Sequence, residues 1–133
     1  MDLSRLQPFA MKYRAGGGEE MFMSFETASQ ARLAGFLRLH LPDAPTRVKM
    51  PTELMRCAII RELHVYGPSL PVGDASDGEA QHRGIGRQLL AAAVDEARLA
   101  GFKRLAVIAS IGTRQYYRQH GFEDGDLYMA RAL

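Results

Sequence analysis

The chain has 133 residues, of which 47% are hydrophobic and 24% are charged, and its formal net charge is +2. This length and composition predict a single globular domain over residues 1–133, large enough to bury a core. No apolar run approaches the roughly 20 residues that span a bilayer, and the first residues lack the build of a secretory signal. We therefore expect a cytoplasmic protein with no membrane segment. The single cysteine, Cys57, excludes an internal disulfide and a cysteine-rich zinc or iron–sulfur site, and no metal site is expected.

Strands arranged as an antiparallel meander are expected in the N-terminal half of the chain. Residues 1–14 are polar and mixed, and we expect them to form an extended or irregular lead-in. Met21–Phe25 is rich in β-favouring side chains. Ala34–Leu41 alternates like a strand with one solvated face until Pro42 stops it. Cys57–Val65 is the strongest β segment of the chain.

The second half is expected to mix helices and strands. Tyr66–Ala80 is rich in Gly, Pro, Ser and Asp and is predicted to be a long loop. It leads into a glycine-containing stretch, Gln81–Gly86, after which apolar residues at helical spacing predict a helix through Leu99. Leu105–Ala109 is a short apolar strand of the kind that is buried on both faces.

A short helix and a last strand complete the expected elements. Thr113 is a suitable N-cap for a helix over Arg114–His120. Gly101 and Gly121 follow the two predicted helices, as expected of residues that end a helix in the left-handed conformation. Tyr128–Ala130 predicts a final edge strand.

The stretch Gln81-His82-Arg83-Gly84-Ile85-Gly86 predicts a phosphate-binding turn at the start of a helix. A helix N-terminus leaves backbone N–H groups unpaired and carries partial positive charge, so it can hold a pyrophosphate. Glycine lets the main chain approach the phosphates with no Cβ in the way, and Arg83 is placed to meet a phosphate oxygen. On its own, a plain tight turn before a helix explains the pattern equally well. The pattern Gln-x-x-Gly-x-Gly resembles the acyl-coenzyme A signature of the GNAT acetyltransferase superfamily.

Two further features stand in the order that an acyl-CoA transferase needs. The backbone of Leu63–Val65 could pair with the amide-bearing pantetheine arm, as an added strand does. Tyr116 and Tyr117 lie on the later predicted helix, four or five residues before Gly121-Phe122. The Tyr-x-x-x-Gly-Phe spacing matches the superfamily at Tyr117, where a tyrosine can protonate the departing thiolate by general acid catalysis.

The superfamily resemblance implies a mixed α/β fold, the GNAT acyl-CoA N-acyltransferase fold. In that fold a central, mostly antiparallel sheet is splayed between its fourth and fifth strands, and the cofactor lies in the notch. Only Glu26–Arg32 separates the first two predicted strands, which is too short for the two helices that usually cover the acceptor side. We therefore expect reduced first helices and an uncovered acceptor side, which suits a large substrate such as RNA.

Longer motifs narrow the resemblance to one family, the C-terminal acetyltransferase domain of elongator protein 3, the catalytic subunit of Elongator. The resemblance covers about residues 9 to 130, and its more specific motifs are Arg-Glu-Leu-His-Val-Tyr-Gly and Gly-Thr-Arg-x-Tyr-Tyr-Arg. The matching segments are Met23–Glu26, Gly35–Leu39, Arg61–Gly67, Gln81–Gly86, Leu105–Ile108 and Gly112–Arg118.

This family resemblance implies an enzyme that presents acetyl-CoA to a tRNA, whose wobble uridine receives the acetyl group at carbon 5. A radical S-adenosylmethionine domain with an iron–sulfur cluster supplies the radical step in the family, and this chain has no cysteine triplet for such a domain. The expected partners are therefore acetyl-CoA, tRNA and a radical domain outside this chain. Tyr117 and Tyr116 are the catalytic candidates. The residues expected to bind acetyl-CoA are Glu62, Leu63, His64, Val65, Gln81, His82, Arg83, Gly84, Ile85, Gly86, Arg87 and Tyr117.

Several alternatives remain open from the sequence. His64 is a proton carrier or, more in keeping with its position, a hydrogen-bonded histidine facing the core. Glu62, expected on the opposite face of the strand, is a general base or the partner of an arginine. His120 is expected only to complement the dipole at the end of its helix. The whole chain could instead be a free-standing N-acetyltransferase acting on an amine or a protein lysine, or a non-catalytic module that binds coenzyme A or docks tRNA.

Overall fold

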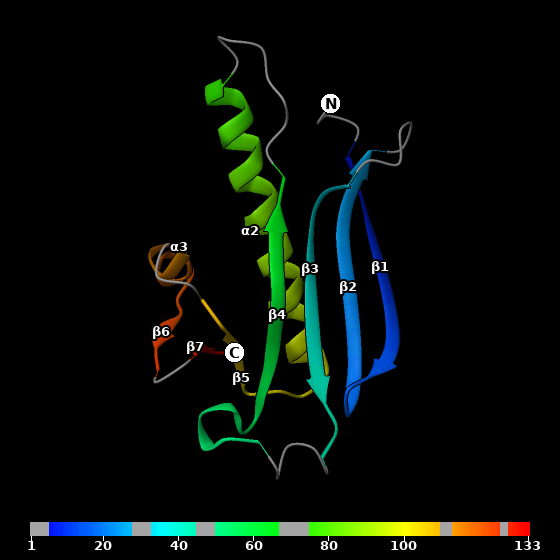
Figure 1. Cartoon of the computed structure of the whole chain (residues 1–133), viewed down its shortest axis with the longest axis vertical. Helices are drawn as coiled ribbons and strands as arrows, with labels where there is room; N and C mark the ends of the chain where they lie inside the picture. The colour runs from blue at the N-terminus through cyan, green and yellow to red at the C-terminus, as the bar shows by residue number, and fades with distance from the viewer. Residues whose placement is uncertain (1–5, 28–32, 45–49, 67–74, 110–112, 126–127) are drawn as a thin grey trace.

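The computed structural model describes residues 6–27, 33–44, 50–66, 75–109, 113–125 and 128–133, without the side chains of Leu6, Thr27, Thr52 and residues 75–83. Within these ranges, the strands form one sheet with the order β1-β2-β3-β4-β5-β7-β6 (Figure 1). The pairing is antiparallel except between β4 and β5, so the expected mixed α/β, mostly antiparallel GNAT-type sheet is confirmed. The strands are β1 (Leu6–Ala15), β2 (Gly18–Thr27), β3 (Leu33–Pro42), β4 (Cys57–Val65), β5 (Arg104–Val107), β6 (Glu123–Asp124) and β7 (Met129–Ala132). The helices are the short 3-10 helix η2 (Thr52–Leu54), α2 (Ala75–Leu99) and α3 (Arg114–Gln119).

The N-terminal meander is confirmed and is longer than expected. Of the extended or irregular lead-in expected for residues 1–14, the part from Leu6 onwards is extended, since β1 pairs along its whole length with β2. Gly16 and Gly17 join the two strands with φ angles of 59° and 81°, which glycine adopts without strain. Pairing with β2 therefore makes a strand of a segment whose own composition is mixed.

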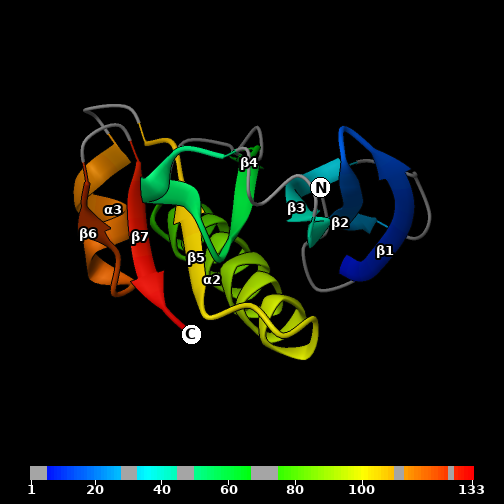
Figure 2. The same ribbon diagram turned by 90° about the horizontal axis from the view of Figure 1, so that it is seen from below.

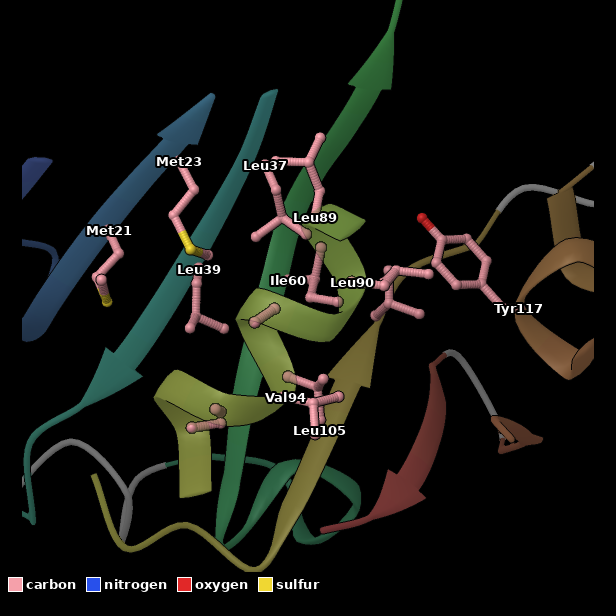
Figure 3. Packing of buried hydrophobic residues seen from close by; sticks show 14 of the residues in the cluster. Met21, Met23, Leu37, Leu39, Ile60, Leu89, Leu90, Val94, Leu105 and Tyr117 are labelled. Carbon is pink, nitrogen blue, oxygen red and sulfur yellow. The ribbon is translucent and has the colours of Figure 1, made fainter. Parts of the chain in front are cut away.

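Helix α2 covers one face of the sheet, and the main core lies between them (Figures 2 and 3). Leu89, Leu90, Ala93, Val94 and Ala97 form the buried stripe of this helix, at the helical spacing expected from the sequence. They pack against alternate residues of the strands, whose side chains on this face point the same way. Those strand residues are Met21, Met23, Leu37, Leu39, Ala58, Ile60, Leu105 and Val107.

The other face of the sheet is not covered by a described helix over β1 to β3, and it carries a row of rings. Phe22 and Phe36 stack with centroids 5.3 Å apart, and Phe36 stacks on His64 at 6.1 Å. Tyr66 lies 4.6 Å from the His64 ring. The connection over residues 28–32, for which short length predicted an uncovered acceptor side, lies outside the described residues.

Two predictions about the glycine-rich middle of the chain are wrong. Helix α2 begins at Ala75, inside the segment predicted to be a loop, and Gly84 and Gly86 lie within the helix instead of in a turn before it. A glycine in a helix costs about 1 kcal/mol relative to alanine, a cost that packing can offset. The remainder of the predicted loop, residues 67–74, lies outside the described part of the chain.

The C-terminal elements agree with the sequence in kind but differ in detail: β5 ends at Val107, two residues before the predicted strand end, and Ile108 is exposed. Helix α3 follows Thr113, although no side-chain hydrogen bond from Thr113 caps it. Gly101 and Gly121 adopt φ angles of 88° and 89°, as expected of helix-ending glycines. The prediction of a final edge strand is wrong, because β7 lies between β5 and the two-residue strand β6.

Candidate functional site

A cleft opens where β4 and β5 part. The parallel pairing of these strands ends at Ile60 and Val107, so the following residues of β4 have no β5 partner. Beyond that point lies a cleft of about 300 Å³. It is lined by Arg61, Glu62, Leu63, His64, Val107, Ile108, Thr113 and Tyr117. The splayed strands that the superfamily resemblance implies are therefore present, with α3 forming one wall.

Tyr117 is the buried tyrosine of this wall. Its side chain projects from α3 towards the core near Leu90 (Figure 3), and only 6% of the residue is exposed. Burial, together with the neighbouring Tyr116, raises the pKa of Tyr117 to about 12. The phenol is therefore protonated throughout the neutral range and can donate a proton or a hydrogen bond into the cleft. Its ring is fixed edge-on against Phe122, with centroids 5.5 Å apart.

Tyr116 occupies a different position on the same helix. Its hydroxyl oxygen is buried and has no hydrogen-bond partner among the described residues. An added Cβ on Gly86 would lie 2.6 Å from this oxygen, so the absence of a side chain at residue 86 is what allows Tyr116 to approach α2. Burial raises the pKa of Tyr116, and the positive charge of Arg87 opposes that rise.

The predicted phosphate-binding stretch runs through the middle of α2. The backbone of Gln81, His82 and Arg83 is helical, and their side chains lie outside the described part of the structure. A Cβ on Gly84 would meet no atom of the described residues within 4 Å, so on that part of the structure Gly84 faces open space. Ile85 is buried, and its side chain lies against the α carbon of Gly35, where a Cβ would come within 2.9 Å.

Glu62 and His64 lie on the same face of β4, so the expectation that they face opposite ways is wrong. Residues two apart on a strand share a face. The Glu62 carboxylate accepts a hydrogen bond of 2.9 Å from Arg38, in agreement with the arginine-partner alternative. His64 is exposed and stacks on Phe36, away from the core that it was expected to face.

A buried charged cluster adjoins the cleft at Arg61. In the pairing of β3 with β4 the register shifts between Arg38 and Leu39, so that Arg61 is the unpaired residue of a bulge. Its Nε lies 3.0 Å from Oε1 of Glu20, a carboxylate that is 94% buried on β2. His40 lies 3.5 Å from the same oxygen, and burial and then the charge of Arg61 lower the pKa of His40. This ion pair fixes the side chain at the bulge from which the cleft begins.

Sequence patterns identified part of this site and missed the rest. The structure brings Glu62, Leu63, His64 and Tyr117 together in the cleft, whereas Gly84, Ile85 and Gly86, the residues of the glycine stretch that are described in full, do not line it. Val107, Ile108 and Arg61 were not singled out, although the end of a buried strand is the signal that could have indicated the first two. Arg61 became recognisable only from the bulge, because pairing register cannot be inferred from one strand.

His120 ends α3 but does not act as the expected positive charge there. Burial lowers its pKa, and the charges of Arg87 and Arg131 lower it further. No described cluster of three or more His, Cys, Asp or Glu could hold a metal ion. Over the described ranges, the chain has no helix that is long and apolar enough to cross a membrane.

Comparison with known proteins agrees with this architecture. The acetyltransferase (GNAT) domain family model matches residues 76–129. Together with the splayed mixed sheet, this match identifies the chain as a GNAT acetyltransferase domain.

More specific similarity lies with proteins that modify tRNA and with Elongator subunits. The tRNA uridine(34) acetyltransferase of Dehalococcoides mccartyi is 44% identical over 124 residues, which cover 92% of this chain and 27% of that protein. Elongator complex protein 3 of Drosophila melanogaster is 41% identical over 123 residues, which cover 91% of this chain and 22% of that protein. The structure of an archaeal Elp3 from Methanocaldococcus infernus superposes with a TM-score of 0.78 at 32% identity, covering 99% of this chain and 31% of that one. The chain belongs to the family of Elp3 proteins and tRNA uridine(34) acetyltransferases, and it matches the C-terminal part of these proteins. It spans about a quarter of their length.

Proposed function

We propose that this chain is the acetyl-CoA-binding domain of an enzyme that acetylates the wobble uridine of tRNA, as the names of its relatives describe for them. The observation that carries the proposal is the cleft between β4 and β5, which has the backbone of Arg61–His64 on one side and Tyr117 on the other. A cleft that opens beside an unpaired strand segment suits a ligand arm with amide groups, which can pair with that strand.

In this proposal, the residues of β4 bind the ligand and the tyrosines of α3 take part in the chemistry. Glu62, Leu63, His64 and Val65 pair with the pantetheine arm and bring the thioester towards α3. In hydrolysis, water adds to the acetyl carbon and the bond from that carbon to the coenzyme A sulfur breaks, so that acetate leaves. Tyr117, which is protonated at neutral pH, donates its proton to the departing sulfur. The tyrosinate that remains is reprotonated from solvent. Tyr116 lies beside it and orients the ligand.

The pyrophosphate is assigned to Gln81–Arg87, a stretch that α2 holds in helical form. Residues in mid-helix have their N–H groups engaged by carbonyls four residues earlier. Phosphate binding at Gly84 and Gly86 therefore requires that the helix begin at this stretch when the ligand is bound, which frees those N–H groups. Gly84, with open space around it, can face the phosphates.

The rest of the reaction lies outside the described domain. Relatives are about four times as long as this chain, and a radical S-adenosylmethionine domain and a tRNA are the partners that the family implies. A cytoplasmic location follows from a tRNA substrate. The competing function is that of a free-standing N-acetyltransferase for an amine or a protein lysine. The ring-bearing sheet face without a described helix over it favours the larger acceptor.

Calorimetry and turnover test the proposal. We expect acetyl-CoA to bind the purified chain, and Gly84→Glu to abolish binding without unfolding the protein, because the added side chain meets open space and places a charge where phosphates bind. Tyr117→Phe is expected to lower tRNA-stimulated acetyl-CoA hydrolysis by about 10²–10⁴-fold. The matched control, Tyr128→Phe, removes a hydroxyl on the opposite side of the sheet and is expected to have no effect.

Two results would count against the assignment. Retained acetyl-CoA affinity in Gly84→Glu would refute the phosphate site. Turnover with small amines in the absence of tRNA, unchanged by adding tRNA, would favour the free-standing N-acetyltransferase.

A further inference from the structure

A second cleft of about 300 Å³ lies between α2, the end of α3 and β7. Its rim is cationic, since Arg87, Arg98 and Arg131 line it, whereas Asp95 is the one acidic residue among the described residues that line it; His120 also lies on this rim. Among the side chains that the structure describes, neither Arg87 nor Arg98 has an ion-pair partner. Unneutralised arginines around a hollow favour an anion.

One of these cations is held in place by the backbone. The Arg131 guanidinium donates from Nη1 to the carbonyl of His120 at 3.1 Å and from Nε to the carbonyl of Ala132 at 3.2 Å. A half-buried guanidinium fixed in this way loses little further conformational freedom when it binds a ligand. The positive charge on this side of the cleft is therefore already oriented.

The cleft also has an apolar floor and an extended shape. Leu90, Val94 and Phe122 are buried beneath the cationic rim. From Arg87 to Arg98 the rim follows α2 over eleven residue steps, which is about 16 Å along a helix axis at 1.5 Å per residue. This length exceeds one phosphate group and suits a chain of phosphodiesters.

Helix α3 separates this cleft from the acetyl-CoA cleft. Tyr117 and Thr113 face the acetyl-CoA cleft, and His120 lies in the cationic cleft one turn further along the same helix. The rings of Tyr116 and His120 are 4.8 Å apart, and those of Tyr117 and Phe122 are 5.5 Å apart. A polyanion held in the cationic cleft therefore lies next to the helix that carries the proposed acid.

We propose that the cationic cleft binds the phosphodiester backbone of the RNA acceptor, with Arg98 and His120 among its contacts, and so positions the RNA beside α3. The inference rests on the proposed function, because it takes RNA to be the acceptor. The group that the cleft would recognise is a phosphate, and coenzyme A also carries one, its 3′-phosphate. The experiment therefore distinguishes an RNA phosphate from the coenzyme A 3′-phosphate.

Arg98 is the residue to change, because Arg87 belongs to the proposed acetyl-CoA set and Arg131 caps α3. The probe is an unmodified tRNA transcript with uridine at the wobble position, and its binding to the full chain is followed by anisotropy over a salt series. Arg98→Gln is expected to weaken binding about eightfold at ~0.1 M salt and to reduce the slope of log affinity against log salt by about 1. Lys103→Gln removes an exposed charge away from both clefts and is the matched control, expected to leave binding unchanged.

Calorimetry with acetyl-CoA, coenzyme A and dephospho-coenzyme A distinguishes the two sources. Affinity for all three is expected to be the same in Arg98→Gln and the unchanged protein. A loss of coenzyme A affinity with retained dephospho-coenzyme A affinity would assign the cleft to the 3′-phosphate and overturn the inference. Equal losses of tRNA affinity in Arg98→Gln and Lys103→Gln would overturn it too, by showing a general charge effect.

The unchanged protein separates this inference from the proposed function. Acetyl-CoA binding without any tRNA binding would overturn the RNA cleft and leave the acetyl-CoA site standing. Failure to bind acetyl-CoA would instead refute the proposed function. A further readout is the pKa of His120, measured by nuclear magnetic resonance. In the free protein, burial and the charges of Arg87 and Arg131 lower this pKa, and a bound phosphate is expected to raise it.

Discussion

The contact between Gly86 and Tyr116 provides a double-mutant test of how α2 and α3 meet. In Gly86→Ala the new Cβ would lie 2.6 Å from the Tyr116 hydroxyl, whereas the next nearest atoms, Tyr116 Cζ and Val65 Cγ2, are both at 3.6 Å. Relieving the short contact needs a shift of about 1 Å, and overpacking of this kind costs about 1–3 kcal/mol. Alanine is about 1 kcal/mol better than glycine in a helix, so the net expected loss of unfolding free energy is about 0–2 kcal/mol.

In a Tyr116→Phe background the hydroxyl is gone, and the same Gly86→Ala change should stabilise the protein by about 1 kcal/mol. Tyr116→Phe alone should be neutral or stabilising, because the hydroxyl is buried with no partner in the described residues. Gly84→Ala is the control, since its Cβ meets nothing within 4 Å and should add about 1 kcal/mol in both backgrounds.

Urea unfolding followed by circular dichroism measures all four proteins of the cycle. The structure requires a coupling of about 1–3 kcal/mol between residues 86 and 116, in the range measured for residues in contact. If Gly86→Ala changes the unfolding free energy equally in both backgrounds, Tyr116 does not approach α2 at this glycine, and the account of Gly86 is wrong.

Three further predictions concern buried ionisable groups. Glu20→Ala should lower the unfolding free energy by about 2 kcal/mol, which is less than for a fully buried pair because Arg61 is partly exposed. The control is Glu19→Ala, which removes an exposed carboxylate and should change the unfolding free energy by less than about 0.5 kcal/mol in the same urea assay. His40, which faces Glu20 and Arg61, has a lowered pKa in the folded state, so the unfolded state binds its proton first and stability should fall as pH drops below 6.5. The difference between the unfolding curves at pH 7 and pH 5 should therefore be smaller in His40→Gln than in the unchanged protein. Because the folded pKa of Tyr117 is about 12 against an ordinary 10, stability should fall as pH rises from 10 to 12, by about 3 kcal/mol; an absorbance titration showing Tyr117 ionised at pH 10 would contradict this.

The sequence predicted those elements whose signal is local. Cys57–Val65 was expected and found with the same bounds, because a run of β-formers on a central strand carries its own pattern. Gly101 and Gly121 were identified as helix ends because a left-handed residue is required there, whatever surrounds it. Tyr117 was predicted as a site residue from its spacing to Gly121-Phe122 along one short helix, and the structure places it in the lining of the cleft between β4 and β5.

What the sequence missed depends on contacts between distant segments. Strand β1 exists because β2 pairs with it, and a single strand's composition does not show its partner. Gly86 was interpreted as part of a turn because glycine favours turns, but the structure uses it to admit Tyr116, thirty residues away. The bulge at Arg61 depends on the register between β3 and β4. A phosphate-binding turn and a close helix contact call for the same residue, so sequence alone cannot distinguish them.

Helix α3 has six residues, which is too short to be stable by itself. Three contacts hold it in place. Tyr117 packs on Phe122, and Arg131 donates a hydrogen bond to the carbonyl of His120, which caps the helix. Arg118 pairs with Asp124 through a hydrogen bond of 2.7 Å. Tyr117 of this helix lines the cleft between β4 and β5, and His120, which caps the helix, lines the cationic cleft. The geometry of the cleft between β4 and β5 is therefore set by side chains that also shape the cationic cleft, and the site owes its form to packing around α3 instead of to helix propensity.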